Sequence, residues 1–200
     1  MYFNKKNSLE INGFTIIEML VTLSIVVIAT GLVMLKYASF NSSVLLNNQA
    51  YAIGFDIRET QSISISVRGA GGEFRQEYGM YFDISTPNQY QLFQDIGDTK
   101  PVQYDDGEEI GDPVIIDPRY TIVDICGTTL TNPIVRHCYS EGDGYPANVS
   151  VAFARPDFEA VMYGDNMGQL SVAEITIAGD IDSTFSKTIL VSNTGQITIQ

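Results

Sequence analysis

The stretch NGFTIIEMLVTLSIVVIATGLVMLKY, from Asn12 to Tyr37, decides how the rest of the chain is interpreted. Its apolar part, residues 14–35, is close to the roughly 20 residues that an α-helix needs to cross a bilayer. One carboxylate, Glu18, lies near its start. An ionised carboxylate in hydrocarbon costs several kcal/mol, so it needs a partner or a changed protonation state. The stretch therefore predicts a membrane helix whose single charge requires an explanation.

A short basic segment precedes the apolar run. Lys5 and Lys6 lie before it, and Lys36 is the only basic residue immediately after it. This order resembles a secretory signal, but the apolar part exceeds the roughly 7–15 residues of a signal core, and no small-x-small cleavage site follows it. The excess of lysines before the run favours an N-terminus in the cytoplasm and a C-terminal body outside. We therefore predict a single-pass membrane protein.

The composition is that of a folded but strongly acidic protein. The chain has 200 residues, with 11 Lys and Arg against 24 Asp and Glu and a formal net charge of −13. This length suggests one domain besides the N-terminal segment, with enough chain to bury a core. Phosphate backbones are held mostly by Lys and Arg, so the composition argues against broad binding to nucleic acid or anionic lipid. No nucleic-acid partner is expected.

Beyond residue 35 the helical pattern continues and becomes amphipathic. No proline occurs before Pro87, and we predict one long helix over about residues 15–64, with residues 36–68 continuing the membrane part. The glycine-rich RGAGGE at 68–73 ends it. Apolar positions mostly three, four or seven apart are expected to pack under the body. These positions are Ala38, Val44, Leu45, Ala52, Phe55 and Ile57.

From residue 72 onward, short alternating runs are separated by turn residues, which is typical of antiparallel strands. The expected strands are 78–83, 90–93, 120–126, 148–154, 159–163, 173–178, 187–192 and 196–200. Asn193-Thr194-Gly195 joins the last two as a hairpin. A long helix followed by many strands predicts an α+β fold, in which the helix packs on an antiparallel β-rich body over residues 72–200.

Residues 95–118 resist the strand interpretation because they are rich in acid. Several oxygen ligands would suit calcium, but the spacing does not match the D-x-[DN]-x-[DN]-G-x₅-E loop. A solvated acidic loop is the simpler interpretation, and calcium binding is the alternative. The acidic residues are Asp105, Asp106, Glu108, Glu109, Asp112 and Asp117.

Cys126 and Cys138 are the only cysteines, and both lie in the part predicted to be exported. In an oxidising compartment they can close a loop of about 13 residues, worth roughly 3 kcal/mol. Two unpaired thiols are the alternative. His137, the single histidine, could suggest a metal site or a thiol–base pair, but CxxC-type zinc spacing is missing. A solvated loop histidine is expected.

No catalytic motif accompanies these residues. GxSxG and a P-loop are both absent from the sequence. An anchored hydrolase would require a pocket that brings His137 to a nucleophile, and no candidate nucleophile stands out. The sequence therefore predicts a protein that is not an enzyme and that needs no cofactor or metal.

At G-F-T-I-I-E-M-L, residues 13–20, the chain resembles the class III signal of type IV prepilins and type II secretion pseudopilins. The resemblance covers the leader at 1–13, the Gly13–Phe14 junction, the glutamate five positions after the cut and the long apolar helix. It implies cleavage after Gly13 by prepilin peptidase and N-methylation of Phe14. Residues 14–35 would then lie in the cytoplasmic (inner) membrane before assembly and in the filament core afterwards.

This resemblance supplies a partner for Glu18. Cleavage would create a cationic amine at Phe14, about one helical turn away. In an assembled bundle, the amine of an incoming subunit can neutralise Glu18 of its neighbour and so fix the axial register. An ordinary signal anchor with a snorkelling glutamate is the alternative, but it leaves the Gly13–Phe14 junction and the leader unexplained.

Within the family, the β-rich body ending in TILVSNTGQITIQ, residues 188–200, is similar to the minor pseudopilins of the H type (GspH/FimT-like). The segment around 56–67 resembles that group's helix. The resemblance implies a non-enzymatic structural subunit of a type II secretion pseudopilus or type IV pilus. Its partners would be prepilin peptidase, other pilin or pseudopilin subunits, an inner-membrane assembly platform and the lipid bilayer. A major type IV pilin and a non-polymerising adhesin or binding module are the alternatives.

Some relatives in this group bind DNA through a basic C-terminal tail. Here the tail, residues 192–200, has no Lys or Arg, and the body is acidic. That activity is therefore not expected.

Overall fold

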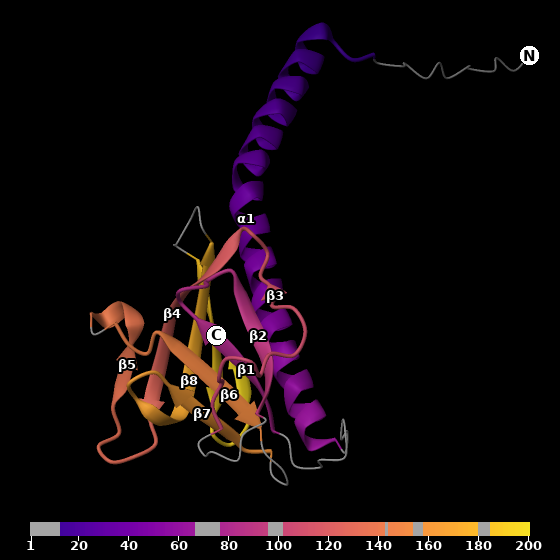
Figure 1. The fold of residues 1–200 in the computed structure, drawn as a ribbon. Coiled ribbons are helices and arrows are strands. Elements are labelled where there is room, and N and C mark those ends of the chain that lie inside the picture. The colour runs from indigo at the N-terminus through magenta and orange to yellow at the C-terminus, as the bar shows by residue number, and fades with distance from the viewer. Residues whose placement is uncertain (1–12, 67–76, 96–101, 143, 154–157, 180–184) are drawn as a thin grey trace, which may run out of the picture. The chain divides into compact units, whose positions relative to one another are not determined.

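The structure is a computed structural model that describes residues 13–66, 77–95, 102–142, 144–153, 158–179 and 185–200, with the backbone alone at 35–41 (Figure 1). It is α+β, as predicted: an apolar helix comes first, and a curled antiparallel sheet follows. Two compact units divide the chain, residues 1–41 and residues 42–200. Most of the predicted leader and the RGAGGE segment lie outside the described residues.

Helix α1 runs from Ile16 to Ile65, within one residue of the predicted bounds at each end. Thr15 precedes its first residue, and the Thr15 hydroxyl accepts a hydrogen bond from the backbone N–H of Glu18 at 3.3 Å. This is how an N-cap threonine satisfies one of the unpaired amides of the first turn. At the other end, the last helical bond runs from the Ser66 amide to the Ser62 carbonyl.

The helical part of the first unit is apolar on every side. The span Ile16–Met34 has a mean hydropathy of 2.4, and none of it is buried inside the protein. A helix that is apolar all round belongs either in a large core or in a membrane. By length and composition this span is sufficient to cross a bilayer, which agrees with the predicted membrane segment.

The α1 residues of the second unit bury one side against the sheet. The buried positions alternate four and three apart and are Leu46, Ala50, Ile53, Ile57, Thr60 and Ser64. The predicted packing face was therefore largely wrong. Ile57 is buried and Leu45 half-buried, but Val44, Ala52 and Phe55 are exposed, and the Ala38 side chain lies outside the description. The prediction failed because the true face includes two hydroxyl residues, whereas the exposed face carries larger apolar ones.

The described part of the body contains ten strands, and all of their pairings are antiparallel, as expected. They are β1 (Glu77–Asp83), β2 (Gln89–Asp95), β3 (Val114–Ile115), β4 (Tyr120–Thr129), β5 (Arg136–Cys138), β6 (Asn148–Phe153), β7 (Ala160–Gly164), β8 (Gly168–Gly179), β9 (Ser186–Ser192) and β10 (Ile197–Ile199). Each of the eight predicted strands overlaps one of these, although Ala154 is not described. Strands β3 and β5 were not predicted, and neither was the short 3₁₀ helix Tyr139–Glu141.

The strand order is β10-β9-β8-β7-β6-β1-β2-β3, and β4 pairs with both β8 and β5. The long strand β8 makes the sheet curl. Its first residues pair with β7, and residues Val172–Ala178 pair with β9, while β4 follows the strand along its other edge. Strands β10 and β3 are therefore the two ends of the main path.

The core lies inside this curl and is closed by the buried side of α1. It is built by alternation along the strands; in β8, for example, Ala173, Ile175 and Ile177 point inward and are fully buried. A smaller cluster of Phe93, Val102 and Ala152 lies apart from the main core. The helix and sheet of residues 42–200 thus share one apolar interior.

Candidate functional site

The residues predicted to govern processing lie at the start of the described chain, in the first unit. Phe14 is 77% exposed, and a Cβ added at Gly13 would meet no atom of the described residues within 4 Å. Packing in the fold therefore gives no steric reason for a glycine at this position. Glu18 is exposed in the first turn of α1, four residues after Phe14.

Thr15 and Glu18 have the spacing of a capping box, T-x-x-E, in which the glutamate is the third helical residue. A carboxylate at this position also interacts favourably with the helix dipole. The Thr15 half of the box is formed, and the position of Glu18 in the first turn favours the start of the helix; this local role was not predicted. This role explains why an acidic residue lies in the first turn of the helix. It does not offset the cost of placing a carboxylate at the edge of the hydrocarbon layer.

The hydroxyl side chains inside the apolar span donate hydrogen bonds to the helix itself. The hydroxyls of Thr22, Ser24 and Thr30 donate to the carbonyls of Met19, Leu20 and Val26 at 3.0, 2.8 and 2.7 Å. Unpaired polar groups are costly in lipid, and such back-bonding removes that cost. These three residues are therefore compatible with a membrane environment.

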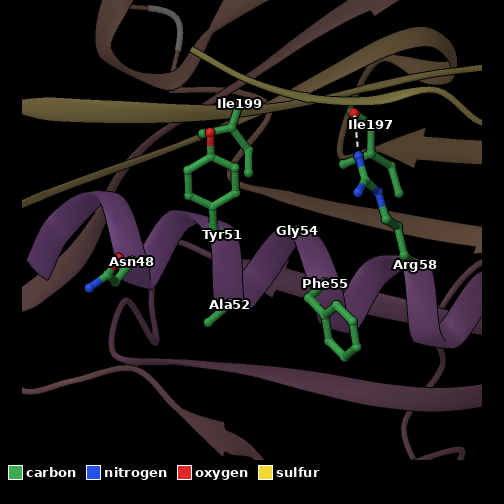
Figure 2. Close-up of a pocket in the computed structure, with 8 residues that line it drawn as sticks. All are labelled: Asn48, Tyr51, Ala52, Gly54, Phe55, Arg58, Ile197 and Ile199. Atoms are coloured by element: carbon green, nitrogen blue, oxygen red, sulfur yellow. Dashed lines mark hydrogen bonds between the residues drawn. The ribbon is translucent and has the colours of Figure 1, made fainter. Parts of the chain in front are cut away.

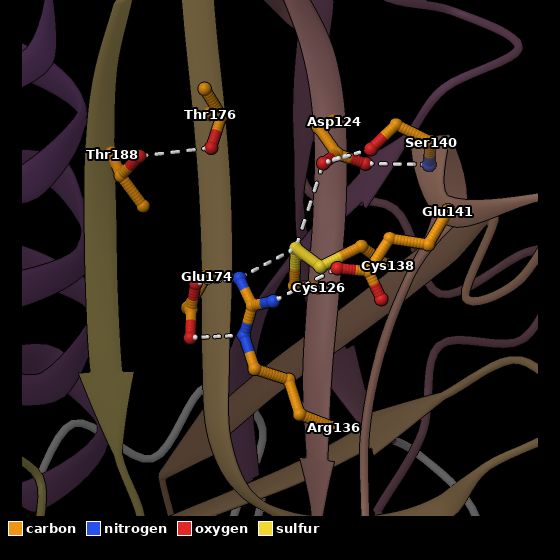
Figure 3. Close-up of a disulfide and its surroundings, with 9 residues drawn as sticks. All are labelled: Asp124, Cys126, Arg136, Cys138, Ser140, Glu141, Glu174, Thr176 and Thr188. Atoms are coloured by element: carbon orange, nitrogen blue, oxygen red, sulfur yellow. Dashed lines mark hydrogen bonds and ion pairs between the residues drawn. A yellow bond between two sulfur atoms is a disulfide. The ribbon is translucent and has the colours of Figure 1, made fainter.

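The two cysteines are joined in the body. Cys126 of β4 lies directly opposite Cys138 of β5, and their sulfurs form a disulfide across 12 positions of sequence (Figure 3). Arg136, on the same short strand, pairs with Glu174 of β8 at 2.8 Å and with Glu141 at 3.4 Å. The disulfide and the ion pairs together hold the β5 segment against β4 and β8.

Asp124, Cys126 and Cys138 are close enough together to suggest a metal site. While the disulfide is intact, however, neither sulfur is available as a thiolate ligand. The Asp124 carboxylate is also engaged, because it accepts hydrogen bonds from the Ser140 amide at 3.0 Å and the Ser140 hydroxyl at 2.7 Å. The group therefore acts as a structural brace.

His137 lies in strand β5, where the sequence predicted a solvated loop. The reason is register: the pairing that places the cysteines opposite each other also places His137 opposite Gly127. Its ring is half-buried and packs against the ring of Tyr145, with 5.1 Å between the centroids. No thiol is available to form the thiol–base pair considered above, because both cysteines are in the disulfide.

The acidic region is ordered by its own hydrogen bonds wherever the structure describes it. Glu109 accepts hydrogen bonds from the Tyr104 hydroxyl and the Gly107 amide, and the bond from Tyr104 is the main reason that the pKa of Glu109 is lowered. Hydrogen bonds from Arg119 lower the pKa of Asp117 to about 2. The region expected to be loop also contains β3 and a bridge from Glu109 to Phe93. Within residues 102–118, no set of three acids converges as a metal site.

Polar contacts also tie α1 to the sheet within the second unit. The Tyr90 hydroxyl of β2 donates to Asp56, and the Ser64 hydroxyl donates to the carbonyl of Phe153. Ser64 also accepts from the Tyr78 amide at 3.3 Å. These contacts were missed by sequence reasoning, although polar residues inside a helix that must pack on a sheet were an available signal.

A groove runs along α1 on the side of β10 (Figure 2). It contains two adjoining hollows of about 360 and 340 Å³ that share Arg58. Figure 2 shows Tyr51 and Arg58 rising from the helix towards Ile199 and Ile197. We call this feature the Arg58 groove. It is lined by Asn48, Tyr51, Ala52, Gly54, Phe55, Arg58, Gln61, Ser62, Ile65, Ser66, Phe158, Ile197 and Ile199.

The tie between Asp56 and Tyr90 predicts a loss of stability at alkaline pH. Burial and the hydrogen bond to Asp56 raise the pKa of Tyr90 well above its ordinary value of about 10. Because the pKa of Tyr90 is higher in the folded state, its contribution to stability is complete below pH 10. Above pH 10 the tyrosine ionises in the unfolded state but not in the folded state, and this contribution is lost. The free energy of unfolding should therefore fall by about 1.4 kcal/mol per pH unit above pH 10 for this group.

Urea unfolding between pH 9 and 11.5, followed by the near-ultraviolet circular dichroism of the tyrosines, measures this slope. Tyr90→Phe removes one group that titrates only in the unfolded state. The free energy of unfolding of this variant should therefore fall less steeply with pH. Equal slopes in the two proteins would contradict the assignment to Tyr90.

Comparison with known proteins gives no assignment. The chain matches no protein-family model, and neither the curated proteins nor the solved structures compared with it give a match.

Proposed function

We propose that the chain is a subunit of a type IV pilus-like filament, and more specifically a minor pseudopilin of the H type. In this role it is a non-enzymatic structural component of a type II secretion pseudopilus or a type IV pilus. Prepilin peptidase cleaves it after Gly13 and methylates Phe14. The apolar segment anchors it in the inner membrane until it joins the filament.

One observation carries the proposal: an apolar helix, uncovered by protein, begins directly after a Gly–Phe junction and carries a single acid in its first turn. The Ile16–Met34 span has none of its residues buried. Glu18 is the only charged residue between residues 13 and 35. A bundle of such helices would bury this surface, and the new amine of Phe14 would neutralise the acid in that setting.

Two features of the body are consistent with this role. The disulfide between Cys126 and Cys138 suits an oxidising compartment, in agreement with a body outside the cytoplasm. The α1 residues that follow the apolar span are held on the body by side-chain bonds such as Tyr90–Asp56. The chain would meet prepilin peptidase, neighbouring pilin subunits and an assembly platform in the membrane.

Glu18→Ala tests the proposal when the full chain is expressed with prepilin peptidase and its filament system. We expect the variant to insert and to be processed, giving a mature chain that begins at methylated Phe14 by mass analysis. Its recovery in sheared filaments should fall at least about tenfold, because the uncompensated amine and lost register disfavour assembly.

Thr15→Ala is the matched control, because it removes the N-cap hydroxyl and retains the acid. If both variants lost assembly equally, Glu18 would be acting as a capping residue and not as a partner of Phe14. A wild-type mature chain that still begins at Met1 would contradict the whole proposal. A Glu18→Ala variant that is processed and assembled normally would contradict the pairing of Glu18 with Phe14, whereas a processed wild-type chain that is never recovered in filaments would support the membrane-anchored binding module.

A further inference from the structure

The Arg58 groove carries an exposed aromatic surface. Tyr51 is 57% exposed, Phe55 66% and Phe158 65%. Single exposed apolar residues are common, but three aromatics that line adjoining hollows are an unusual surface for a soluble face. Tyr51 and Phe55 lie on α1 and Phe158 precedes β7, so the surface is formed by elements distant in sequence.

Electrostatics restrict what the groove can accept. Among the residues that the structure describes, Arg58 is the only charged one that lines either hollow. One of its terminal nitrogens donates to the Ile197 carbonyl at 3.2 Å, which holds the guanidinium beside the groove. Among the described residues, Arg58 forms no ion pair, and a guanidinium has five N–H donors. The groove therefore suits a carboxylate that is accompanied by apolar side chains.

The same chain presents such a surface at the other end of its main sheet path. Asp112, Val114 and Ile115 are exposed within four consecutive positions, and Ile115 is 63% exposed. Val114 and Ile115 form β3, the edge strand at the end of the main path, and β10 is the strand at its other end. A short acidic and aliphatic edge thus complements a cationic and aromatic groove.

The dimensions of the two surfaces agree. A chain from Asp112 to Ile115 spans at most about 10 Å. From Arg58 back to Tyr51 along α1, the distance is also about 10 Å at 1.5 Å per residue. With the Asp112 carboxylate on Arg58, the Val114 side chain can reach the hollow above Gly54, while Ile115 points to the opposite face of the strand. Ile199 and Ile197 pack over Gly54 and form one wall of this hollow, because a Cβ added at Gly54 would lie 3.1 Å from Cδ1 of Ile199 and 3.9 Å from Cγ2 of Ile197.

We propose that the Arg58 groove of one copy binds the Asp112–Ile115 edge of a second copy. The contact uses different surfaces on the two partners, so it leaves one groove and one edge free and can repeat as an open chain. Its role in a filament rests on the proposed function, but the contact itself does not. Symmetric pairing of two α1 helices in register is less favourable because it brings two Arg58 side chains together.

Charge reversal tests the contact in the full-length chain in detergent micelles. Energy transfer between donor- and acceptor-labelled copies reports their association at about 0.15 M salt. Arg58→Glu and Asp112→Arg should each weaken association about three- to tenfold, as expected for reversing one charge in an exposed pair. The double variant should recover most of the affinity. Lys187→Glu and Asp106→Arg are matched controls with the same charge changes and should leave association unchanged.

Single cysteines at Ala52 and Val114 test the geometry, because both native cysteines are in the disulfide. A mixture of Ala52→Cys and Val114→Cys should cross-link, whereas each variant alone should not. Cross-linking of Ala52→Cys with itself would indicate helix pairing and overturn the proposal. Failure of the double charge variant to recover would also overturn it. These results are independent of processing at Gly13, so failure of the filament proposal would not mimic them.

Discussion

Gly195→Ala is expected to lower the free energy of unfolding of the β body by about 3 kcal/mol. Gly195 lies in the β9–β10 turn with a φ of +78°, which is unfavourable for a residue with a side chain. A Cβ at this position would also overlap the carbonyl oxygen of Phe158 and lie 2.7 Å from the side-chain nitrogen of Gln61. Strain and overlap therefore act together.

The Phe158 carbonyl cannot withdraw without cost. It accepts a hydrogen bond from Gln61 of α1 at 3.0 Å, and two residues later the Ala160 amide donates to the Asn193 carbonyl at 2.9 Å. Relief of the overlap would have to disturb one of these bonds. The substitution should consequently weaken the attachment of the β9–β10 turn to the helix, and hydrogen exchange in both segments should increase.

Gly168→Ala is the matched control because Gly168 has a similar φ of +73° but no atom within 4 Å of an added Cβ. It should cost only about 1–2 kcal/mol, the price of the backbone conformation alone. Urea unfolding of the full chain, followed by tyrosine circular dichroism, measures both variants. Equal losses would show that the crowding around Gly195 is without consequence.

The strands could be predicted because a sheet with one buried side gives sequences in which apolar and polar residues alternate. In β8, Ala173, Ile175 and Ile177 are fully buried and alternate with the half-buried Glu174 and Thr176. Strand β3 was missed because two residues in an acidic, proline-containing region give no periodic signal. Strand β5 was missed because three residues give too short a pattern, and its register is fixed by a partner across the disulfide.

The candidate sites also differ in whether a local sequence pattern could predict them. Gly13, Phe14 and Glu18 could be found from the sequence because they are neighbours in a distinctive order. The Arg58 groove could not, because it joins residues that are far apart in the chain, such as Arg58 and Ile197 at a separation of 139. These residues meet only when the chain folds, so no local sequence pattern predicts their contact.

The orientation of α1 was the main failure of prediction, and Ile57→Ala tests the corrected orientation. Ile57 is fully buried in the core shared by helix and sheet. Removing its side-chain atoms should cost about 2–5 kcal/mol through lost burial and the cavity left behind. Phe55→Ala, two residues earlier, removes a larger side chain from a position that is 66% exposed and should change the free energy of unfolding by no more than about 0.5 kcal/mol.

The comparison is decisive because hydrophobicity alone gives the opposite order. A phenylalanine carries more apolar area than an isoleucine, so a helix placed by its largest apolar residues would depend more on Phe55. The two positions differ by about 160° around the helix axis at 3.6 residues per turn, and they cannot both face the core. A larger loss for Phe55→Ala than for Ile57→Ala in urea unfolding would mean that α1 lies on the sheet by the side that carries Phe55. The Arg58 groove would then be part of the core.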